Sequence, residues 1–164
     1  MFNNQTDGIA PSYKTWILVA NRSSAHVLAS DGGAKNLRLL ETISFPEGRL
    51  KNREIDTDRA SGSSMAEGGA NFPVHGLVNK DEAHFHMTQI FARQLCEKLN
   101  KARAENEFQR LVLVAEPRFL GELRASLDSS TLSRVTHSAD KGLVDLNLKQ
   151  LKERLAQMLT FRAA

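Results

Sequence analysis

Cysteine is nearly absent from this sequence, since Cys96 is the only one among 164 residues. A lone cysteine cannot form a disulfide within the chain, so a disulfide-stabilised secreted scaffold is disfavoured. Cys96 lies in an apolar segment with helical periodicity. This position predicts a small buried side chain rather than a reactive thiol.

Long hydrophobic runs are also missing. No segment approaches the roughly 20 apolar residues that span a bilayer, which argues against a membrane-embedded protein. The polar start, Met1 to Lys14, has no basic stretch followed by an apolar one, so it does not follow the pattern of a signal peptide. We therefore expect a cytoplasmic protein with no membrane partner.

The complete motifs of common catalytic sites are absent as well. Neither the Gly-x-Ser-x-Gly nucleophile pattern nor the glycine-rich phosphate loop occurs. His75, His84 and His86 are close in sequence, but helix positions two apart point in different directions and cannot share a metal ion. We expect no catalytic residue, no metal site and no cofactor, so an enzyme is less favoured than a binding protein. A hydrolase with His75 or His84 as its base is the least favoured alternative.

The charge balance is only mildly basic, with 22 Lys and Arg against 19 Asp and Glu and a formal charge of +3. This surplus is a weak indication of nucleic-acid binding, because it is equally compatible with charges spread over the whole surface. The hydrophobic fraction of 41% is typical of a globular protein. We interpret residues 15–159 as a single domain with flexible tails at 1–14 and 160–164.

Short apolar segments and helical periodicities alternate along this domain. The predicted elements are strands at 16–20, 25–29 and 37–45, a helix at 80–103, a strand at 110–115, a helix from 117 to 127, a strand at 134–137 and a closing helix at about 148–158. The three early strands are expected to form an antiparallel meander. The order βββαβαβα predicts an α/β fold, a mixed sheet with packed helices.

The segment 46–79 interrupts this order as a long loop, because it has no hydrophobic period and holds five of the ten glycines. A connection of this length in a compact domain is usually functional or disordered, and we expect it to be mobile and to carry the binding site. Its basic residues alternate with acidic ones, so a solvated loop is at least as well supported as a phosphate-binding patch. The candidate binding residues are Arg49, Lys51, Arg53, Arg59, Gly68, Gly69 and Ala70.

Three stretches of the sequence indicate a protein family when they are taken together: TWILVAN at 15–21, RLVLVAEPRFLGELR at 110–124 and DKGLVDL at 140–146. Together they resemble the bacterial host attachment protein family. The likeness covers about Lys14 to Leu159, and the central stretch is its most specific part. This family is similar in turn to the middle domain of the archaeal and eukaryotic class-1 peptide release factors, which implies the same fold.

In those factors an exposed Gly-Gly-Gln loop precedes a long helix and enters the peptidyl-transferase centre. The corresponding position in this chain holds Gly68-Gly69-Ala70, so the glutamine is missing. The chain also shows neither the decoding domain nor the partner-binding domain of a complete release factor, and we do not expect it to read stop codons. The resemblance implies a domain whose loop visits ribosomal or transfer RNA through its backbone.

The leading hypothesis from the sequence is a non-enzymatic module that associates with the ribosome or RNA and acts indirectly on attachment to host cells. The alternative is a protein-interaction domain that binds a cytoplasmic regulator through an apolar surface. Salt distinguishes the two, because phosphate contacts weaken steeply as the salt concentration rises.

Overall fold

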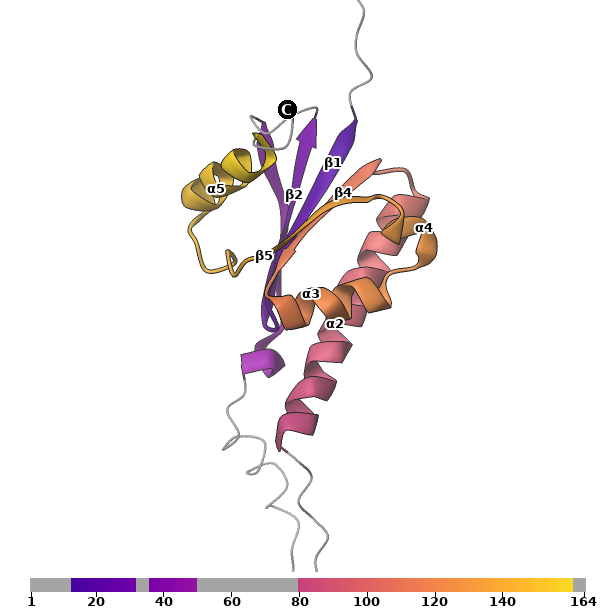
Figure 1. The fold of residues 1–164 in the computed structure, drawn as a ribbon, viewed down its shortest axis with the longest axis vertical. Coiled ribbons are helices and arrows are strands. Elements are labelled where there is room, and N and C mark those ends of the chain that lie inside the picture. The colour runs from indigo at the N-terminus through magenta and orange to yellow at the C-terminus, as the bar shows by residue number, and fades with distance from the viewer. Residues whose placement is uncertain (1–12, 32–35, 50–79, 161–164) are drawn as a thin grey trace, which may run out of the picture.

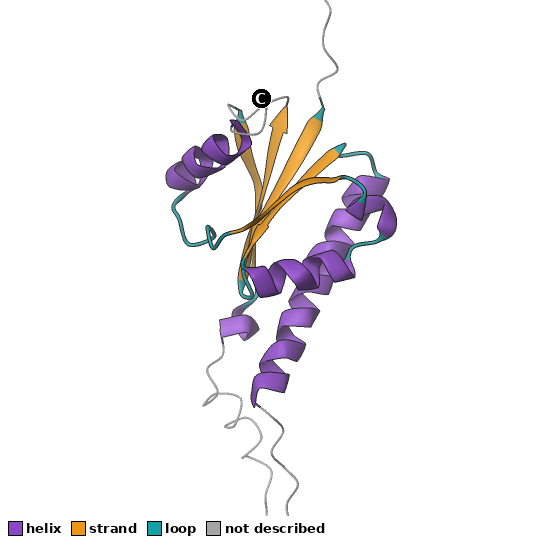
Figure 2. Ribbon diagram, viewed as in Figure 1, coloured by secondary structure: helices purple, strands orange, loops and turns teal. Residues whose placement is uncertain are grey.

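The computed structural model describes residues 13–31, 36–49 and 80–160. They form a five-stranded sheet of order β3-β2-β1-β4-β5 with helices on both faces (Figures 1 and 2). The strands are β1 (Lys14–Ala20), β2 (Ser24–Asp31), β3 (Leu37–Ser44), β4 (Arg110–Ala115) and β5 (Val135–Asp140). The helices are the 3-10 helix η1 (Pro46–Arg49) and the α-helices α2 (Lys80–Ala104), α3 (Pro117–Ser126), α4 (Ser129–Leu132) and α5 (Leu148–Thr160).

The sheet is mixed, as predicted. β1 pairs antiparallel with β2 and β2 with β3, which confirms the meander, whereas β4 pairs parallel with both β1 and β5. Two short helices, η1 and α4, were not predicted, because four residues are too few to show a period. The prediction of a loop from residue 46 is therefore wrong for residues 46–49, and residues 50–79 lie outside the described ranges.

Alternation along β1 divides the core into two layers. Leu18 and Ala20 face α2 and α3, whereas Ile17 and Val19 face α5. The first layer is the larger one and includes the buried apolar stripe of α2, whose members recur at helical spacing. That stripe consists of Phe91, Ala92, Leu95, Cys96, Leu99 and Ala102.

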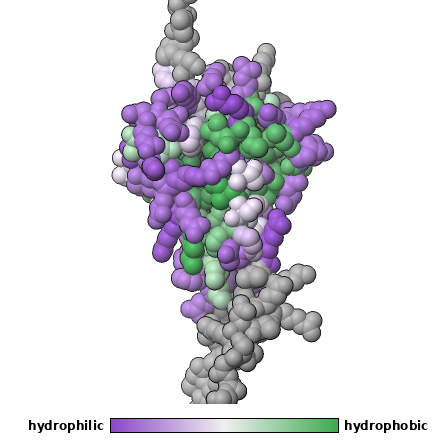
Figure 3. Space-filling view, turned by 180° about the vertical axis from the view of Figure 1, so that it is seen from behind, coloured by the Kyte–Doolittle hydropathy of each residue, from purple (hydrophilic) through white to green (hydrophobic). Residues whose placement is uncertain are grey.

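The second layer is covered by α5 through the buried side chains Leu151 and Leu155. Leu39 of β3 and Met158 of α5 are only partly buried at the border of this layer. Seen from behind, apolar surface gathers in the upper centre of the molecule and polar side chains surround it (Figure 3).

A stack of three phenylalanines ties the end of β3 to the helices. The ring of Phe45 lies 4.9 Å from that of Phe91 on α2, and the ring of Phe91 lies 5.8 Å from that of Phe119 on α3. Such pairs contribute roughly 0.5–1.5 kcal/mol each beyond the area that they bury. Because Phe45 immediately precedes η1, this stack fixes the place where η1 begins.

Candidate functional site

A polar cleft lies beyond the carboxyl ends of β1 and β4. The chain leaves β1 towards β2 on one side and leaves β4 towards β5 on the other, so the two connections diverge at this point. Crevices of this kind are the usual ligand sites of open α/β sheets. The cleft has a volume of about 500 Å³ and is lined by Asn21, Arg22, Ser23, Gly48, Arg49, Glu116 and Asp145.

Asn21 shapes the tight turn between β1 and β2. Its Oδ1 accepts hydrogen bonds from the backbone N–H of Ser23 at 2.9 Å and of Ser24 at 2.8 Å, and its own N–H donates to the Ser24 carbonyl. Asparagine favours such turns because its short side chain reaches the backbone two residues on. The exposed Arg22 stands at the tip of this turn, beside the cleft.

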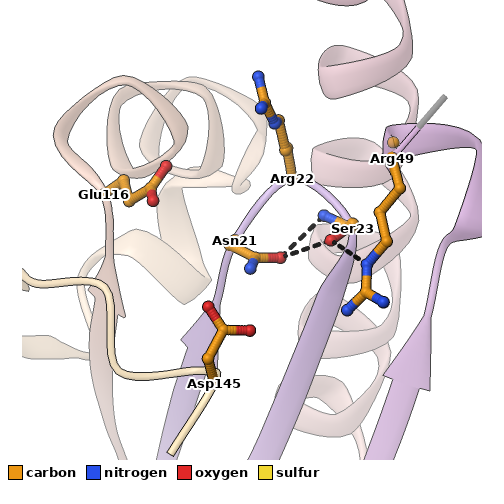
Figure 4. A pocket seen from close by; sticks show the side chains of 7 residues that line it. Asn21, Arg22, Ser23, Arg49, Glu116 and Asp145 are labelled. Atoms are coloured by element: carbon orange, nitrogen blue, oxygen red, sulfur yellow. Dashed lines mark hydrogen bonds between the residues drawn. The ribbon is translucent and has the colours of Figure 1, made fainter. Parts of the chain in front are cut away.

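The helix η1 brings a second arginine to the cleft. The backbone N–H of Phe45 donates to the Ser23 carbonyl at 2.8 Å, and the Arg49 Nε donates to the Ser23 Oγ at 3.2 Å. Figure 4 shows the Nε of Arg49 directed towards Ser23, whose hydroxyl in turn donates a hydrogen bond to the Oδ1 of Asn21. Arg49 is therefore positioned from the β1–β2 turn, although it is 26 positions away from Ser23 in sequence.

The opposite wall is acidic. Glu116 follows β4 directly and precedes Pro117, the first residue of α3, and its side chain makes no capping hydrogen bond to that helix. Asp145 comes from the connection between β5 and α5. Figure 4 shows both carboxylates on the side of the cleft away from Arg49. Neither side chain caps the helix that follows it, so both carboxylates are available to a ligand in the cleft.

The connection that carries Asp145 is held by its neighbour Val144. The side chain of Val144 is buried in the second core layer, and its carbonyl oxygen lies 3.1 Å from the Nε2 of His26 on β2. Because a carbonyl oxygen only accepts, Nε2 is the donor in this hydrogen bond, and the Nδ1 of His26 lies 3.0 Å from the Oγ1 of Thr42. A strand of the sheet, β2, thereby holds the connection that carries Asp145.

The two walls carry opposite charge and do not neutralise each other through contact. Among the described residues, neither Arg22 nor Arg49 comes within ion-pair distance of Glu116 or Asp145. The cleft therefore combines guanidinium donors from Arg22 and Arg49, here called the arginine wall, with carboxylate acceptors from Glu116 and Asp145, the acidic wall. Such a site suits a ligand that has an anionic group at one end and hydrogen-bond donors at the other.

Only one predicted binding residue falls in the described ranges. Arg49 lines the cleft, and the other six candidates (Lys51, Arg53, Arg59, Gly68, Gly69 and Ala70) lie outside the described residues. Four other residues of the cleft were not predicted from the sequence as binding residues: Asn21, Arg22, Glu116 and Asp145. One signal was available, because Asn21 and Glu116 each follow an apolar strand immediately, and such positions meet at one edge of a parallel sheet.

Cys96 is buried, as predicted, with 1% of its surface exposed. Burial raises the pKa of its thiol to about 12, and the Sγ donates to the carbonyl of Leu123 at 3.3 Å. A protonated, inaccessible thiol is a poor nucleophile. Among the described residues, no group of three or more His, Cys, Asp or Glu side chains is arranged to hold a metal ion. His84 and His86 both lie on α2, and His75 lies outside these residues.

The model of one protein family, described as "Protein required for attachment to host cells", matches residues 16–155. The chain belongs to this family. The match confirms the resemblance seen in the sequence, and every residue that lines the cleft lies within the matched range. No helix in the described part of the chain is long and apolar enough to cross a membrane. Among the curated proteins, none matches the chain.

Solved structures that are similar to this family member include a protein described as "Archaeal protein", with 12% identity and a TM-score of 0.46 over 92% of this chain and 37% of that one. The archaeal translation termination factor aRF1 is similar at 10% identity and a TM-score of 0.46, over 88% and 37%. A PilM-PilN type IV pilus biogenesis complex follows at 14% and 0.40, over 93% and 46%. The chain spans less than half the length of each, and at these scores the likeness carries no argument about function.

Proposed function

We propose that this member of the host attachment family is a non-enzymatic module that binds RNA on the ribosome through the arginine wall of the cleft. The observation that carries the proposal is that Arg22 and Arg49, from separate elements, line one cleft at the carboxyl edge of the sheet. Guanidinium groups match the geometry of phosphate oxygens and keep their charge at any physiological pH. Contacts to phosphate and sugar make up half or more of the hydrogen bonds in protein–DNA complexes.

The make-up of the cleft supports binding rather than catalysis. The described residues that line it include no Cys, His or Lys, so the usual nucleophiles and bases other than carboxylates are missing. The hydroxyl of Ser23 lies 3.1 Å from the amide oxygen of Asn21 and accepts from Arg49, so no general base activates it. These contacts favour recognition of a ligand over covalent chemistry at Ser23.

Attachment to host cells would then depend on this protein indirectly. A module that associates with ribosomes would act on attachment through translation, without itself contacting the host. An indirect role fits both the family's description and a cleft suited to nucleic acid. Further phosphate contacts would come from the candidates Lys51, Arg53 and Arg59, which follow η1 in sequence.

Sedimentation of a cell lysate through a sucrose gradient tests the proposal. The wild type is expected to migrate with ribosomal particles at low salt and to leave them as salt rises, because phosphate contacts weaken through counterion release. The Arg22→Ala/Arg49→Ala double variant should dissociate at lower salt, whereas Arg93→Ala, an exposed arginine on α2 outside the cleft, should behave as the wild type does. Migration of the wild type at the top of the gradient at every salt concentration would contradict the proposal.

A second candidate function, binding of a protein regulator, is favoured by exposed apolar side chains. Phe85 on α2 is 45% exposed and Leu40 on the edge strand β3 is 40% exposed. Apolar contacts weaken less with salt than phosphate contacts do. Stoichiometric capture of one defined protein that survives nuclease and high salt, and that is lost in Phe85→Ser or Leu40→Ser, would favour this function over RNA binding.

A further inference from the structure

We infer that the acidic wall of the cleft reads a ribose hydroxyl, so that Glu116 and Asp145 make the site specific for a phosphorylated ribose over a phosphorylated deoxyribose. The inference deepens the proposed function and rests on it for RNA as the source of that sugar. The two groups of side chains bind different parts of the ligand. The arginine wall holds the phosphate, and the acidic wall accepts hydrogen bonds from the sugar.

The arrangement of the two walls carries this inference. A purely phosphate-binding cleft has no use for carboxylates, which repel an approaching phosphate. Glu116 and Asp145 nevertheless both line the cavity, and they reach it from two different connections, after β4 and after β5. Figure 4 places their carboxylates across the cleft from Arg49. The ligand must therefore present hydrogen-bond donors on the side away from its anionic group.

A ribose with a phosphate meets this requirement. Its 2′-hydroxyl is a donor that a carboxylate accepts, and this group is what distinguishes RNA from DNA at a protein site. An acidic side chain that holds a ribose hydroxyl at the carboxyl edge of a parallel sheet is a known solution in nucleotide-binding folds. Deoxyribose offers no such donor at this position, so the carboxylates would repel the DNA backbone without any compensating bond.

The size and lining of the cleft limit what else it recognises. Its volume of about 500 Å³ is within the range of small-ligand sites, which is roughly 300–1,000 Å³. The described residues that line it include no aromatic side chain on which a base would stack. Single-stranded binding proteins that hold bases use such stacking platforms. Recognition here is therefore of the sugar-phosphate backbone, and it should be independent of base sequence.

Paired titrations with a short single-stranded RNA and a DNA of the same sequence test the inference. For the wild type we expect a preference for RNA of roughly tenfold, the lower end of what a hydrogen bond to a charged group contributes. RNAs of unrelated sequence should bind within about threefold of one another if the backbone alone is read. Equal affinity for RNA and DNA would overturn the inference and leave the proposed function intact.

The variant that isolates the acidic wall is Glu116→Gln with Asp145→Asn, which removes both charges and keeps the side-chain shapes. DNA affinity should rise, because the repulsion is gone, and the RNA-to-DNA ratio should fall towards one. Glu97→Gln, an exposed carboxylate on α2 outside the cleft, is the matched control and should change neither value. A ratio that stays at the wild-type value in the double variant would contradict the inference.

A competition experiment separates the source of the ribose from its recognition. A ribonucleoside monophosphate should displace the RNA from the wild type, and the matching deoxyribonucleoside monophosphate should do so at least several-fold less well. Binding of the ribonucleoside monophosphate without any binding of RNA would contradict the proposed function and support the sugar site. If neither RNA nor the monophosphate binds, both are overturned.

Discussion

Gly48 packs against the carbonyl group of Arg22 without any space for a side chain. A Cβ on Gly48 would lie 2.0 Å from the Arg22 oxygen and 2.9 Å from its carbonyl carbon. Both atoms belong to the backbone, so neither can rotate away. The glycine is therefore what allows η1 to lie directly on the β1–β2 turn, and this contact places Arg49 next to Ser23.

Gly48→Ala should displace η1 and disorder the arginine wall. We expect the free energy of unfolding to fall by about 1–3 kcal/mol, as for other overpacking substitutions, and RNA affinity to fall with it. Denaturant titration and RNA binding measure the two effects. Gly121→Ala is the control, because a Cβ on Gly121 in α3 meets nothing within 4 Å. That variant should be unchanged or stabilised by up to about 1 kcal/mol. Equal behaviour of the two alanine variants would show that the close approach has no role.

Asn21 should be required for its oxygen and not for its amide nitrogen, because Oδ1 accepts from the backbone of Ser23 and Ser24. Asn21→Ala is expected to lower the free energy of unfolding by about 1–2 kcal/mol, since two backbone donors lose their partner. Asn21→Asp keeps the acceptor and should keep most of the stability. It adds a negative charge to the cleft, however, so RNA affinity should fall. An aspartate variant as unstable as the alanine variant would contradict this account.

The fold could be predicted from the sequence because its main elements are strongly patterned. The run 16–20 and the strand 110–115 are short and almost wholly apolar, and the long helix α2 shows a clear apolar stripe. The cleft could not be predicted in the same way. It forms where Asn21, Glu116 and Asp145 converge from three connections, and only the parallel pairing of β1 with β4 and of β4 with β5 brings those connections together.

Arg49 was predicted as a binding residue for a different reason from the one that the structure gives. In the sequence it is the first of several basic residues in a glycine-rich segment. In the fold it is the last residue of η1 and is held by the Ser23 hydroxyl. The 3-10 helix itself depends on a tertiary contact, the approach of Gly48 to Arg22, and no local pattern encodes a contact of that kind.

Cys96 should make the folded protein less stable at alkaline pH. Burial raises the pKa of its thiol from 9.0 to about 12, so between these values the unfolded chain releases a proton that the folded chain keeps. Rising pH therefore favours unfolding in this window. The free energy of unfolding of the wild type should fall more between pH 8 and pH 10 than that of Cys96→Ala, which cannot titrate there. Parallel pH profiles of the two proteins would contradict the burial of an ionisable thiol.

Asp128 should make the folded protein less stable at acid pH. Hydrogen bonds from the backbone and side chain of Thr131 hold the pKa of this carboxyl below its usual value, and Arg103 adds to the effect at 3.3 Å. The stabilisation is present above the unfolded pKa and is lost as the pH falls through the folded pKa. Below about pH 4 the wild type should lose more stability than Asp128→Asn, which keeps an acceptor for the Thr131 N–H but does not titrate. Identical acid profiles would be the contrary result.

The salt dependence of RNA binding decides whether Arg22 and Arg49 hold phosphate groups of the RNA. For a short single-stranded RNA, the logarithm of the binding constant should fall linearly with the logarithm of salt concentration, and each phosphate contact contributes a slope of about 0.7. Arg22→Ala/Arg49→Ala should reduce that slope by about 1.4, whereas Arg93→Ala should leave it unchanged. An unchanged slope in the double variant, or RNA binding that salt does not weaken, would show that the arginine wall does not hold phosphate.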